Sequence, residues 1–234
     1  MSGLDRIEYE DRGTRLTGWL ARPTCPPSAA IVVYPTIVNV NPAVERRASM
    51  LADAGYLAMI ADLYGEPVES FNTVGPLAEK LRKDVVHYRT RLRSAVEALA
   101  SLPDARHLRI GAIGYCLGGQ AALEVARDGA DLAGVVSFHG LLATAEAAAP
   151  GTVKARILVC HGDADPMVPR KQVIAFWEEM DRAGADWHFH SYSGVKHGFT
   201  DPASDERDLD AVAYDASADR QSWAAMLGFF SEIF

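Results

Sequence analysis

Residues 114–119 read Gly-Tyr-Cys-Leu-Gly-Gly, and this stretch decides how the chain is interpreted. It follows the apolar segment 109–113, typical of a buried strand, and precedes 120–126, typical of a helix. Small residues around one larger side chain let a strand and a helix meet in a sharp turn that projects that side chain clear of the backbone. We therefore interpret the stretch as a nucleophile elbow that carries Cys116 at the start of the helix.

The position at a helix N-terminus favours a reactive thiol at Cys116, because unpaired N–H groups and the helix dipole stabilise a thiolate. The N–H of Leu117, directly after the cysteine, is a candidate donor to an oxyanion. A cysteine among small residues can also be an inert core thiol. Dinucleotide binding at the turn is disfavoured, because the glycines do not spell G-x-G-x-x-G and no acidic residue follows at a suitable place.

Length and composition predict one α/β domain over residues 1–234, because half of the 234 residues are apolar and no linker or repeat divides the chain. A net charge of -8 argues against nucleic acid or an anionic membrane as a partner. No stretch resembles a signal peptide or a membrane span. Three cysteines are too few for a disulfide framework. We expect a cytoplasmic monomer or homodimer without a cofactor or metal.

Hydrophobic patterns predict strands that alternate with helices along most of the chain. A half-exposed strand or hairpin is expected at 15–21, and further strands at 30–34, 56–61, 109–113, 132–138, 157–160 and 187–192. Helices are expected at 42–54, capped by Asn41 and ended by Gly55, over a long segment reaching Leu99, at 120–126 and 171–183, and around Trp223, Met226, Leu227 and Phe230. This order predicts a mostly parallel sheet covered by helices on both faces, with functional residues at the carboxyl ends of the strands.

The arginines between Arg82 and Arg93 are the only basic concentration in the sequence. They alternate at helical spacing with apolar residues from Val85 to Leu99. This pattern predicts a helix whose arginines form a solvated face.

An acid and a base follow the elbow at the ends of later strands. Segment 161–169, His-Gly-Asp-Ala-Asp-Pro-Met-Val-Pro, begins where a predicted strand ends, and His197 follows the last predicted strand. The chain order of nucleophile, acid and base is that of the α/β-hydrolase arrangement. His197 would take the thiol proton, and a carboxylate would hold the imidazole in the correct tautomer. We favour Asp165 as this carboxylate over Asp163, which has the pattern of a turn former.

Other polar groups follow predicted strands at the same edge of the sheet. The N–H of Ile37, after the 30–34 strand, is the nearest candidate for a second oxyanion donor. His139, at another strand end, either faces the pocket or is a structural histidine. Cys160, His161 and the pair His188 and His190 suggest a metal. His188 and His190 share one face of a strand, but no carboxylate or third histidine is suitably placed for them, so we expect no metal.

The chain resembles the dienelactone hydrolase family in four segments: Asp62-Leu63-Tyr64-Gly65, the elbow at 114–119, segment 161–169, and His197-Gly198-Phe199. The resemblance spans most of the chain. It implies one α/β-hydrolase domain without a large lid and a triad of Cys116, His197 and Asp165. It also implies hydrolysis of a small-molecule ester or lactone through a thioester acyl-enzyme.

Two positions depart from the family's best-known members, which have a glutamate where this chain has Thr36 and an arginine where it has Asp201. We therefore expect a neutral or differently charged ester rather than dienelactone itself. The expected pocket residues are Thr36, Tyr64, His139, Phe199 and Asp201. Acyl transfer or thioester hydrolysis on the same triad, and a non-catalytic binding protein with this fold, are the alternative functions.

Overall fold

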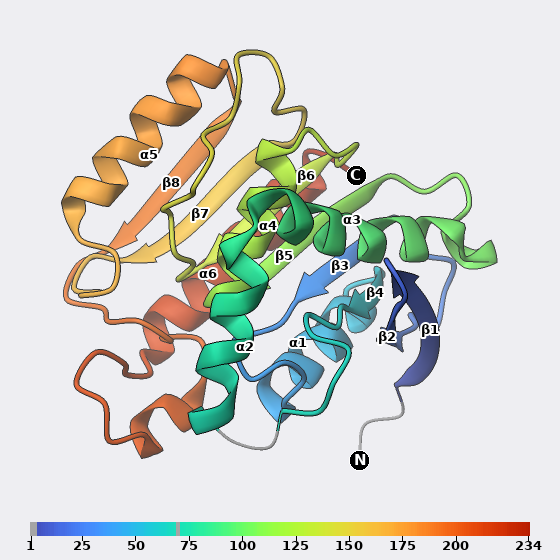
Figure 1. Ribbon diagram of the computed structural model, residues 1–234, viewed down its shortest axis with the longest axis horizontal. Coiled ribbons are helices and arrows are strands. Elements are labelled where there is room, and N and C mark those ends of the chain that lie inside the picture. The colour runs from blue at the N-terminus through green and yellow to red at the C-terminus, as the bar shows by residue number, and fades with distance from the viewer. Residues whose placement is uncertain (1–3, 69–70) are drawn as a thin grey trace. The chain divides into compact units, whose positions relative to one another are not determined.

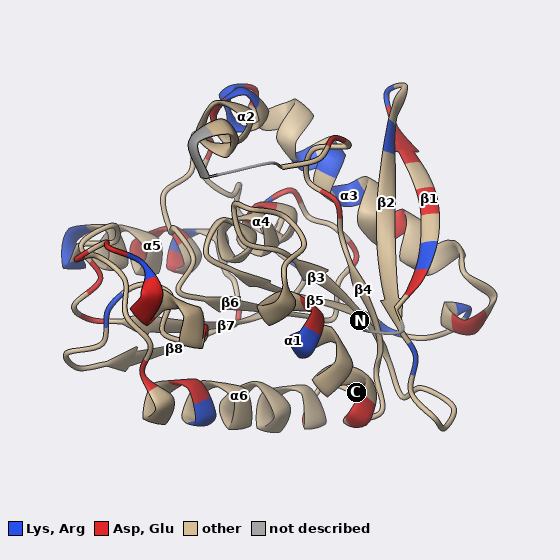
Figure 2. Cartoon of the chain, turned by 90° about the horizontal axis from the view of Figure 1, so that it is seen from below, with Lys and Arg blue, Asp and Glu red and all other residues tan. Residues whose placement is uncertain are grey.

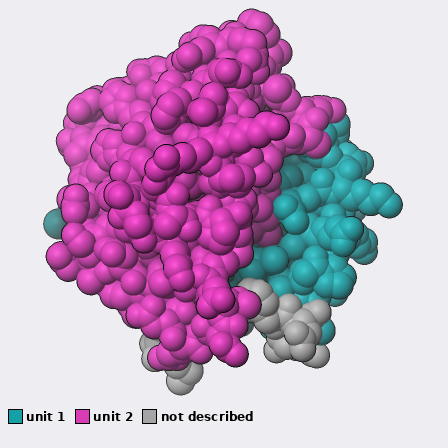
Figure 3. Space-filling model, turned by 90° about the vertical axis from the view of Figure 1, so that its left-hand side faces the viewer, with its two compact units in different colours: residues 1–113 teal, residues 114–234 magenta. Residues whose placement is uncertain are grey.

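The computed structural model describes residues 4–68 and 71–234 (Figure 1). The chain divides into two compact units, unit 1 with residues 1–113 and unit 2 with residues 114–234 (Figure 3). Strand β5 (Ile110–Tyr115) begins in unit 1 and ends in unit 2, next to β3 and β6 in the strand order. The expectation of one domain over the whole chain stays a prediction.

Unit 1 contains the antiparallel strands of the chain. Strands β1 (Asp5–Asp11) and β2 (Thr14–Ala21) form a hairpin, and β2 pairs antiparallel with β4 (Leu57–Ile60). Strand β4 then pairs parallel with β3 (Ala30–Tyr34), and both are buried throughout because their residues are apolar on both faces. Most residues of β1 are charged, as Figure 2 shows, which suits a strand at the edge of a sheet.

The described residues of unit 1 form three α-helices and one short 3-10 helix. Helix α1 (Pro42–Asp53) begins as predicted, since the Asn41 side chain accepts hydrogen bonds from two N–H groups of its first turn. The predicted long helical segment is wrong in one respect, because it is divided into α2 (Phe71–Lys83) and α3 (Val85–Ser101). Asp84 separates them by capping α3: its carboxylate accepts the N–H of His87. A short 3-10 helix, η1 (Pro103–Ala105), follows α3.

The prediction that the α3 arginines are all solvated is wrong for Arg89 and Arg91, which are buried. Nε of Arg91 donates to Asp11 at 2.7 Å and its Nη1 donates to the carbonyl of Leu63 at 3.2 Å. The helical spacing of the arginines was predicted correctly. Arg91 nevertheless lies in the interior, because it pairs with the buried carboxylate of Asp11, 80 positions earlier in the sequence.

Unit 2 contains parallel strands in the order β6 (Gly134–Phe138), β7 (Arg156–Gly162) and β8 (Trp187–Tyr192). Its helices are α4 (Leu117–Arg127), α5 (Arg170–Ala183) and α6 (Ala216–Ser231), with a short 3-10 helix η2 (Pro202–Glu206). In Figure 2, α4 and α5 lie on one face of these strands and α6 on the other. The predicted alternation of strands and helices is confirmed.

The core of each unit consists of its central strands and the inward faces of its helices. Strands β3, β4, β6 and β7 are almost entirely buried. Among the described residues, no helix combines the length and the apolar character needed to cross a membrane.

Candidate active site

Cys116 lies in the turn between β5 and α4, so the predicted strand, turn and helix are confirmed. Its backbone has φ 57° and ψ -118°, a conformation that costs a residue with a Cβ about 1 to 3 kcal/mol. The turn is tight: a Cβ on Gly114 would collide with the backbone of Gly118, and one on Gly119 would come within 2.7 Å of the Cα of Gly140. Glycine at 114 therefore allows β5 and α4 to meet around Cys116, and glycine at 119 allows α4 to approach the residues at the end of β6.

Asp165 and His197 meet after the carboxyl ends of the neighbouring strands β7 and β8. Oδ2 of Asp165 lies 2.7 Å from Nδ1 of His197, and both side chains are almost completely buried. The carboxylate is fixed by its own loop, since Oδ1 accepts the N–H of Met167 at 2.8 Å. The backbone of His197 is held by hydrogen bonds to residues 211 and 213. The carboxylate is an acceptor, so it selects the tautomer with a proton on Nδ1.

The charge of His197 is set by Cys116 and Asp165. Burial lowers the pKa of His197, but the negative charge of a Cys116 thiolate and the hydrogen bond to Asp165 outweigh burial and raise the pKa to about 10. The Nε2 atom is buried and bonds to no nitrogen or oxygen atom of the described residues. A hydrogen bond between the His197 ring and the Cys116 thiol also raises the pKa of His197, so the two side chains are placed to exchange a proton.

Asp163, the alternative acid, has a different partner. Its carboxylate makes two hydrogen bonds to Arg170 at the start of α5, at 2.6 and 3.0 Å. Hydrogen bonding to Arg170 lowers the pKa of Asp163. Of the two candidate carboxylates, Asp165 is therefore the one that is hydrogen-bonded to His197.

The candidate oxyanion donors lie in different units. Leu117 is the first residue of α4, so its N–H has no acceptor within the helix. Ile37 lies in unit 1, where its carbonyl accepts the hydroxyl of Tyr64 at 2.9 Å. Thr36 lies beside it and accepts a hydrogen bond from Asn41 at 3.0 Å. The roles assigned to Ile37, Thr36 and Tyr64 stay predictions.

Phe199 and Asp201 follow His197 in unit 2. Phe199 is fully buried and packs its ring against His139 and Tyr192, at centroid distances of 5.2 and 5.6 Å. Asp201 is ion-paired with Arg207 at 2.8 Å, and its other oxygen accepts an N–H of η2. The negative charge of Asp201 is therefore compensated within the chain, which removes the reason to expect repulsion of anionic substrates.

The Asp62–Gly65 segment builds a loop of unit 1. Oδ1 of Asp62 accepts hydrogen bonds from Asn39 and from the N–H groups of Tyr64 and Gly65, each at 3.0 Å. Oδ2 accepts the N–H of Thr17 at 3.1 Å, so one carboxylate connects three chain segments. A charge that accepts four hydrogen bonds within its own unit stabilises the fold there.

The three cysteines lie in different environments. Cys25 is exposed, Cys160 is buried and Cys116 is partly exposed. Burial raises the pKa of the Cys160 thiol to about 12, which keeps this group protonated and unreactive. Cys116 is thus the one cysteine that combines partial exposure, a helix N-terminus and a neighbouring imidazole.

The histidines considered for a metal do not form a cluster. His188 and His190 both lie on β8, and His161 lies at the end of β7 with neither ring nitrogen bonded to a described residue. Within residues 4–68 and 71–234, no three histidine, cysteine or acidic side chains converge as metal ligands would. The expectation that the protein uses no metal stays a prediction.

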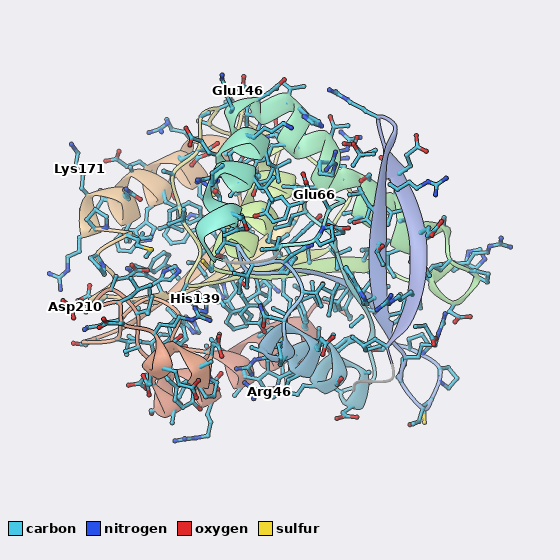
Figure 4. The ribbon with its side chains drawn as sticks, turned by 60° about the horizontal axis from the view of Figure 1, so that its bottom comes forward. Arg46, Glu66, His139, Glu146, Lys171 and Asp210 are labelled. Atoms are coloured by element: carbon cyan, nitrogen blue, oxygen red, sulfur yellow. The ribbon has the colours of Figure 1, made fainter. Side chains whose placement is uncertain are left out.

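His139 has contacts that sequence reasoning did not foresee. Its Nδ1 accepts the backbone N–H of Cys116 at 3.1 Å, and its Nε2 lies 2.9 Å from Oγ1 of Thr200. The side chain is buried among packed neighbours, as Figure 4 shows. The sequence indicated only that His139 follows a strand, and this position did not predict its contacts with Cys116 and Thr200.

A second group that the sequence did not reveal is the buried cluster around Arg127. Arg127 donates hydrogen bonds to Glu124 and Glu179 at 2.8 to 3.1 Å and to the carbonyl of Leu142 at 2.8 Å. Glu179 also accepts the N–H of Ala148 at 3.0 Å. The cluster connects α4 and α5 to the loop after β6.

The parallel strands, the tight turn after β5 and the buried carboxylate-imidazole pair after β7 and β8 define the α/β-hydrolase class. Residues 16–234 match the dienelactone hydrolase family. The chain belongs to this family and is a hydrolase, and the resemblance of its sequence motifs is confirmed.

Comparison with individual proteins agrees with the family. A solved structure described as a dienelactone hydrolase-like promiscuous phosphotriesterase P91 from metagenomic libraries superposes with a TM-score of 0.92, with 34% identity over 99% of this chain and 98% of the other. The carboxymethylenebutenolidase of Pseudomonas putida is 29% identical over 78% of this chain and 79% of its own length. The uncharacterized protein K02A2.1 of Caenorhabditis elegans is 40% identical over 62% of this chain and 92% of its own length.

Proposed function

We propose that this protein hydrolyses carboxylic esters or lactones with Cys116 as the nucleophile, His197 as the base and Asp165 as the group that orients His197. The observation that carries this proposal is the 2.7 Å contact between Asp165 and Nδ1 of a buried imidazole whose pKa a Cys116 thiolate raises. Family membership supports the reaction class.

The reaction proceeds in two halves. The Cys116 thiolate attacks the carbonyl carbon, the ester C–O bond breaks, and the alcohol leaves with the proton that His197 carries. The acyl group then remains on sulfur as a thioester. His197 next removes a proton from water, the hydroxide adds to the thioester carbonyl, and the C–S bond breaks to release the acid. Asp165 stabilises the imidazolium in both halves.

The N–H of Leu117 is the proposed donor to the oxyanion in both halves. It belongs to the first turn of α4, where unpaired N–H groups and the helix dipole favour negative charge.

A panel of small esters, lactones and thioesters tests the proposal, with wild type, Cys116→Ala and Cys25→Ala in parallel. Cys25 is an exposed thiol and controls for non-specific thiol chemistry. We expect turnover of esters or lactones by wild type and Cys25→Ala and none by Cys116→Ala. Faster turnover of thioesters than of oxygen esters would favour the thioesterase alternative. Binding without turnover by wild type would favour the non-catalytic one.

Phosphotriester hydrolysis is a second candidate activity for the same residues. The P91 structure, 34% identical over 99% of this chain, is described as a promiscuous phosphotriesterase. Diethyl 4-nitrophenyl phosphate tests this activity, and loss of turnover in Cys116→Ala would assign it to the same thiol.

We also propose that the enzyme acts in the cytoplasm, where its three free cysteines stay reduced.

A further inference from the structure

His139 lies between the turn that carries Cys116 and the loop that carries His197. It follows β6, and its imidazole contacts both segments, although 23 positions separate it from Cys116 and 61 from Thr200. The ring also packs edge-on against the His197 ring, with centroids 5.1 Å apart and an interplanar angle of 68°. One buried side chain therefore contacts the backbone of the proposed nucleophile and the ring of the proposed base.

The two hydrogen bonds define where the proton of His139 lies. A backbone N–H can only donate, so Nδ1 accepts from Cys116 and carries no proton. The neutral ring therefore has its proton on Nε2 and donates it to Oγ1 of Thr200, which is buried. Thr200 lies three positions after His197, so the same ring holds the histidine loop.

We propose that His139 is a positioning residue that connects the Cys116 turn to the His197 loop and so fixes the sulfur relative to the imidazole. This inference rests on the proposed function of Cys116 and His197. The turn needs external support because Cys116 has a strained backbone. The N–H of Cys116 is shared between Nδ1 of His139 and the carbonyl of Phe138, each at 3.1 Å, so the His139 ring is one of two acceptors that hold this strained residue. His139 itself has φ 40°, so strained residues face each other across the contact.

The matched variants separate the hydrogen bonds from the bulk of the ring. His139→Asn keeps an acceptor oxygen near the position of Nδ1 and tolerates positive φ well. His139→Leu removes the acceptor and fills part of the space. Thr200→Val removes the hydroxyl with little change of shape, whereas Thr200→Ser retains it. Thermal melting of each variant shows whether the fold is intact.

We expect His139→Leu to lower kcat by about 100-fold with little change of KM, because a displacement of about 1 Å between reacting groups has this effect. His139→Asn should recover most of the loss. Thr200→Val should lower kcat less, and Thr200→Ser should recover it. A ring that only filled space would not give the recovery in both pairs.

The rate of Cys116 alkylation by iodoacetamide at neutral pH tests the positioning without any substrate. We expect His139→Leu and Thr200→Val to react more slowly than wild type, and His139→Asn and Thr200→Ser to react at near the wild-type rate. Equal alkylation rates and equal kcat across all folded variants would overturn the inference. If His139→Leu does not fold, an equal rate in Thr200→Val and Thr200→Ser would overturn it. Turnover by Cys116→Ala would instead overturn the proposed function. The alkylation rates would then still show whether His139 and Thr200 position the Cys116 thiol.

Discussion

Unit 2 contains two buried charged groups that differ in the kind of partner to which they are bonded. In the Arg127 cluster the guanidinium donates four hydrogen bonds of 2.8 to 3.1 Å to Glu124, Glu179 and the carbonyl of Leu142. In the Asp165–His197 pair Nδ1 lies 2.7 Å from the Asp165 carboxylate, and the other hydrogen-bonding neighbour of the ring is the Cys116 thiol. Both groups are buried, but only the second includes a partner that can gain or lose a proton near neutral pH.

The difference distinguishes a group that stabilises the fold from one that is ready to react. A network whose members all have partners rigidifies the structure, because each bond strengthens in the low dielectric of the interior. A buried histidine that pairs with a titratable thiol, and a strained cysteine backbone, oppose stability, and proteins retain such features where they serve function. We therefore expect substitutions in the two groups to affect different measurements.

The largest effect is expected from the reactive pair. Asp165→Asn should fold normally but lose about 10⁴-fold in kcat, because the imidazole is no longer held in the tautomer that accepts the thiol proton. Cys116→Ala and His197→Ala should each abolish turnover, and the double variant should be scarcely worse, because the residues act as a unit. Steady-state kinetics measure the losses. An additive loss in the double variant would contradict the shared mechanism.

The Arg127 cluster should respond in stability instead. Arg127→Met removes the buried cation to which Glu124 and Glu179 are hydrogen-bonded and should lower the free energy of unfolding by about 3 to 5 kcal/mol. Chemical denaturation measures this change, and kcat per folded molecule should stay close to wild type. Glu124→Gln and Glu179→Gln added to Arg127→Met should recover part of the stability, because no unpaired charge then remains buried. No recovery would show that packing rather than charge determines the loss.

The pH dependence of thiol reactivity provides a third comparison. The pKa of His197 is raised to about 10, so the ring is positively charged at neutral pH and loses its proton only as the pH rises toward 10. The cation favours the Cys116 thiolate, so iodoacetamide should modify wild type well below pH 8.5, near which an ordinary thiol titrates. In His197→Ala the reaction should require pH values near 8.5. Identical pH profiles would show that His197 does not influence the thiol.

The smallest effect is expected at Asp163, which lies two positions before Asp165. Its partner Arg170 is 78% exposed in its side chain, and exposed ion pairs contribute little. Asp163→Asn should therefore leave both kcat and the melting temperature near wild type. A loss of activity like that of Asp165→Asn would identify Asp163 as the acid.

Much of the fold followed from local sequence signals. The 30–34 and 187–192 strands, the Asn41 cap and the turn at Cys116 depend on neighbouring residues, so periodicity and glycine placement were enough to predict them. The break between α2 and α3 was missed although Asp84 offered a capping signal. The order of nucleophile, acid and base was also local information, because each residue follows its own strand.

The remaining features depend on contacts between distant parts of the chain. His139 and Thr200 are 61 positions apart, and Arg127 and Glu179 are 52 apart. No spacing rule connects such pairs, because the topology of the sheet and the paths of the loops bring them together. Local spacing did not predict the ion pair between Asp201 and Arg207 either, because the path of η2 brings these two residues together.

The identity of the acylated residue tests the central claim most directly. Wild type and Cys116→Ala are mixed briefly with p-nitrophenyl acetate, quenched in acid and digested, and the acetylated peptide is identified by mass spectrometry. We predict one acetyl group on Cys116 in wild type, formed with a burst of p-nitrophenol, and neither acetyl group nor burst in Cys116→Ala. Acetylation of another residue together with a burst that persists in Cys116→Ala would contradict the assignment of Cys116 as the nucleophile.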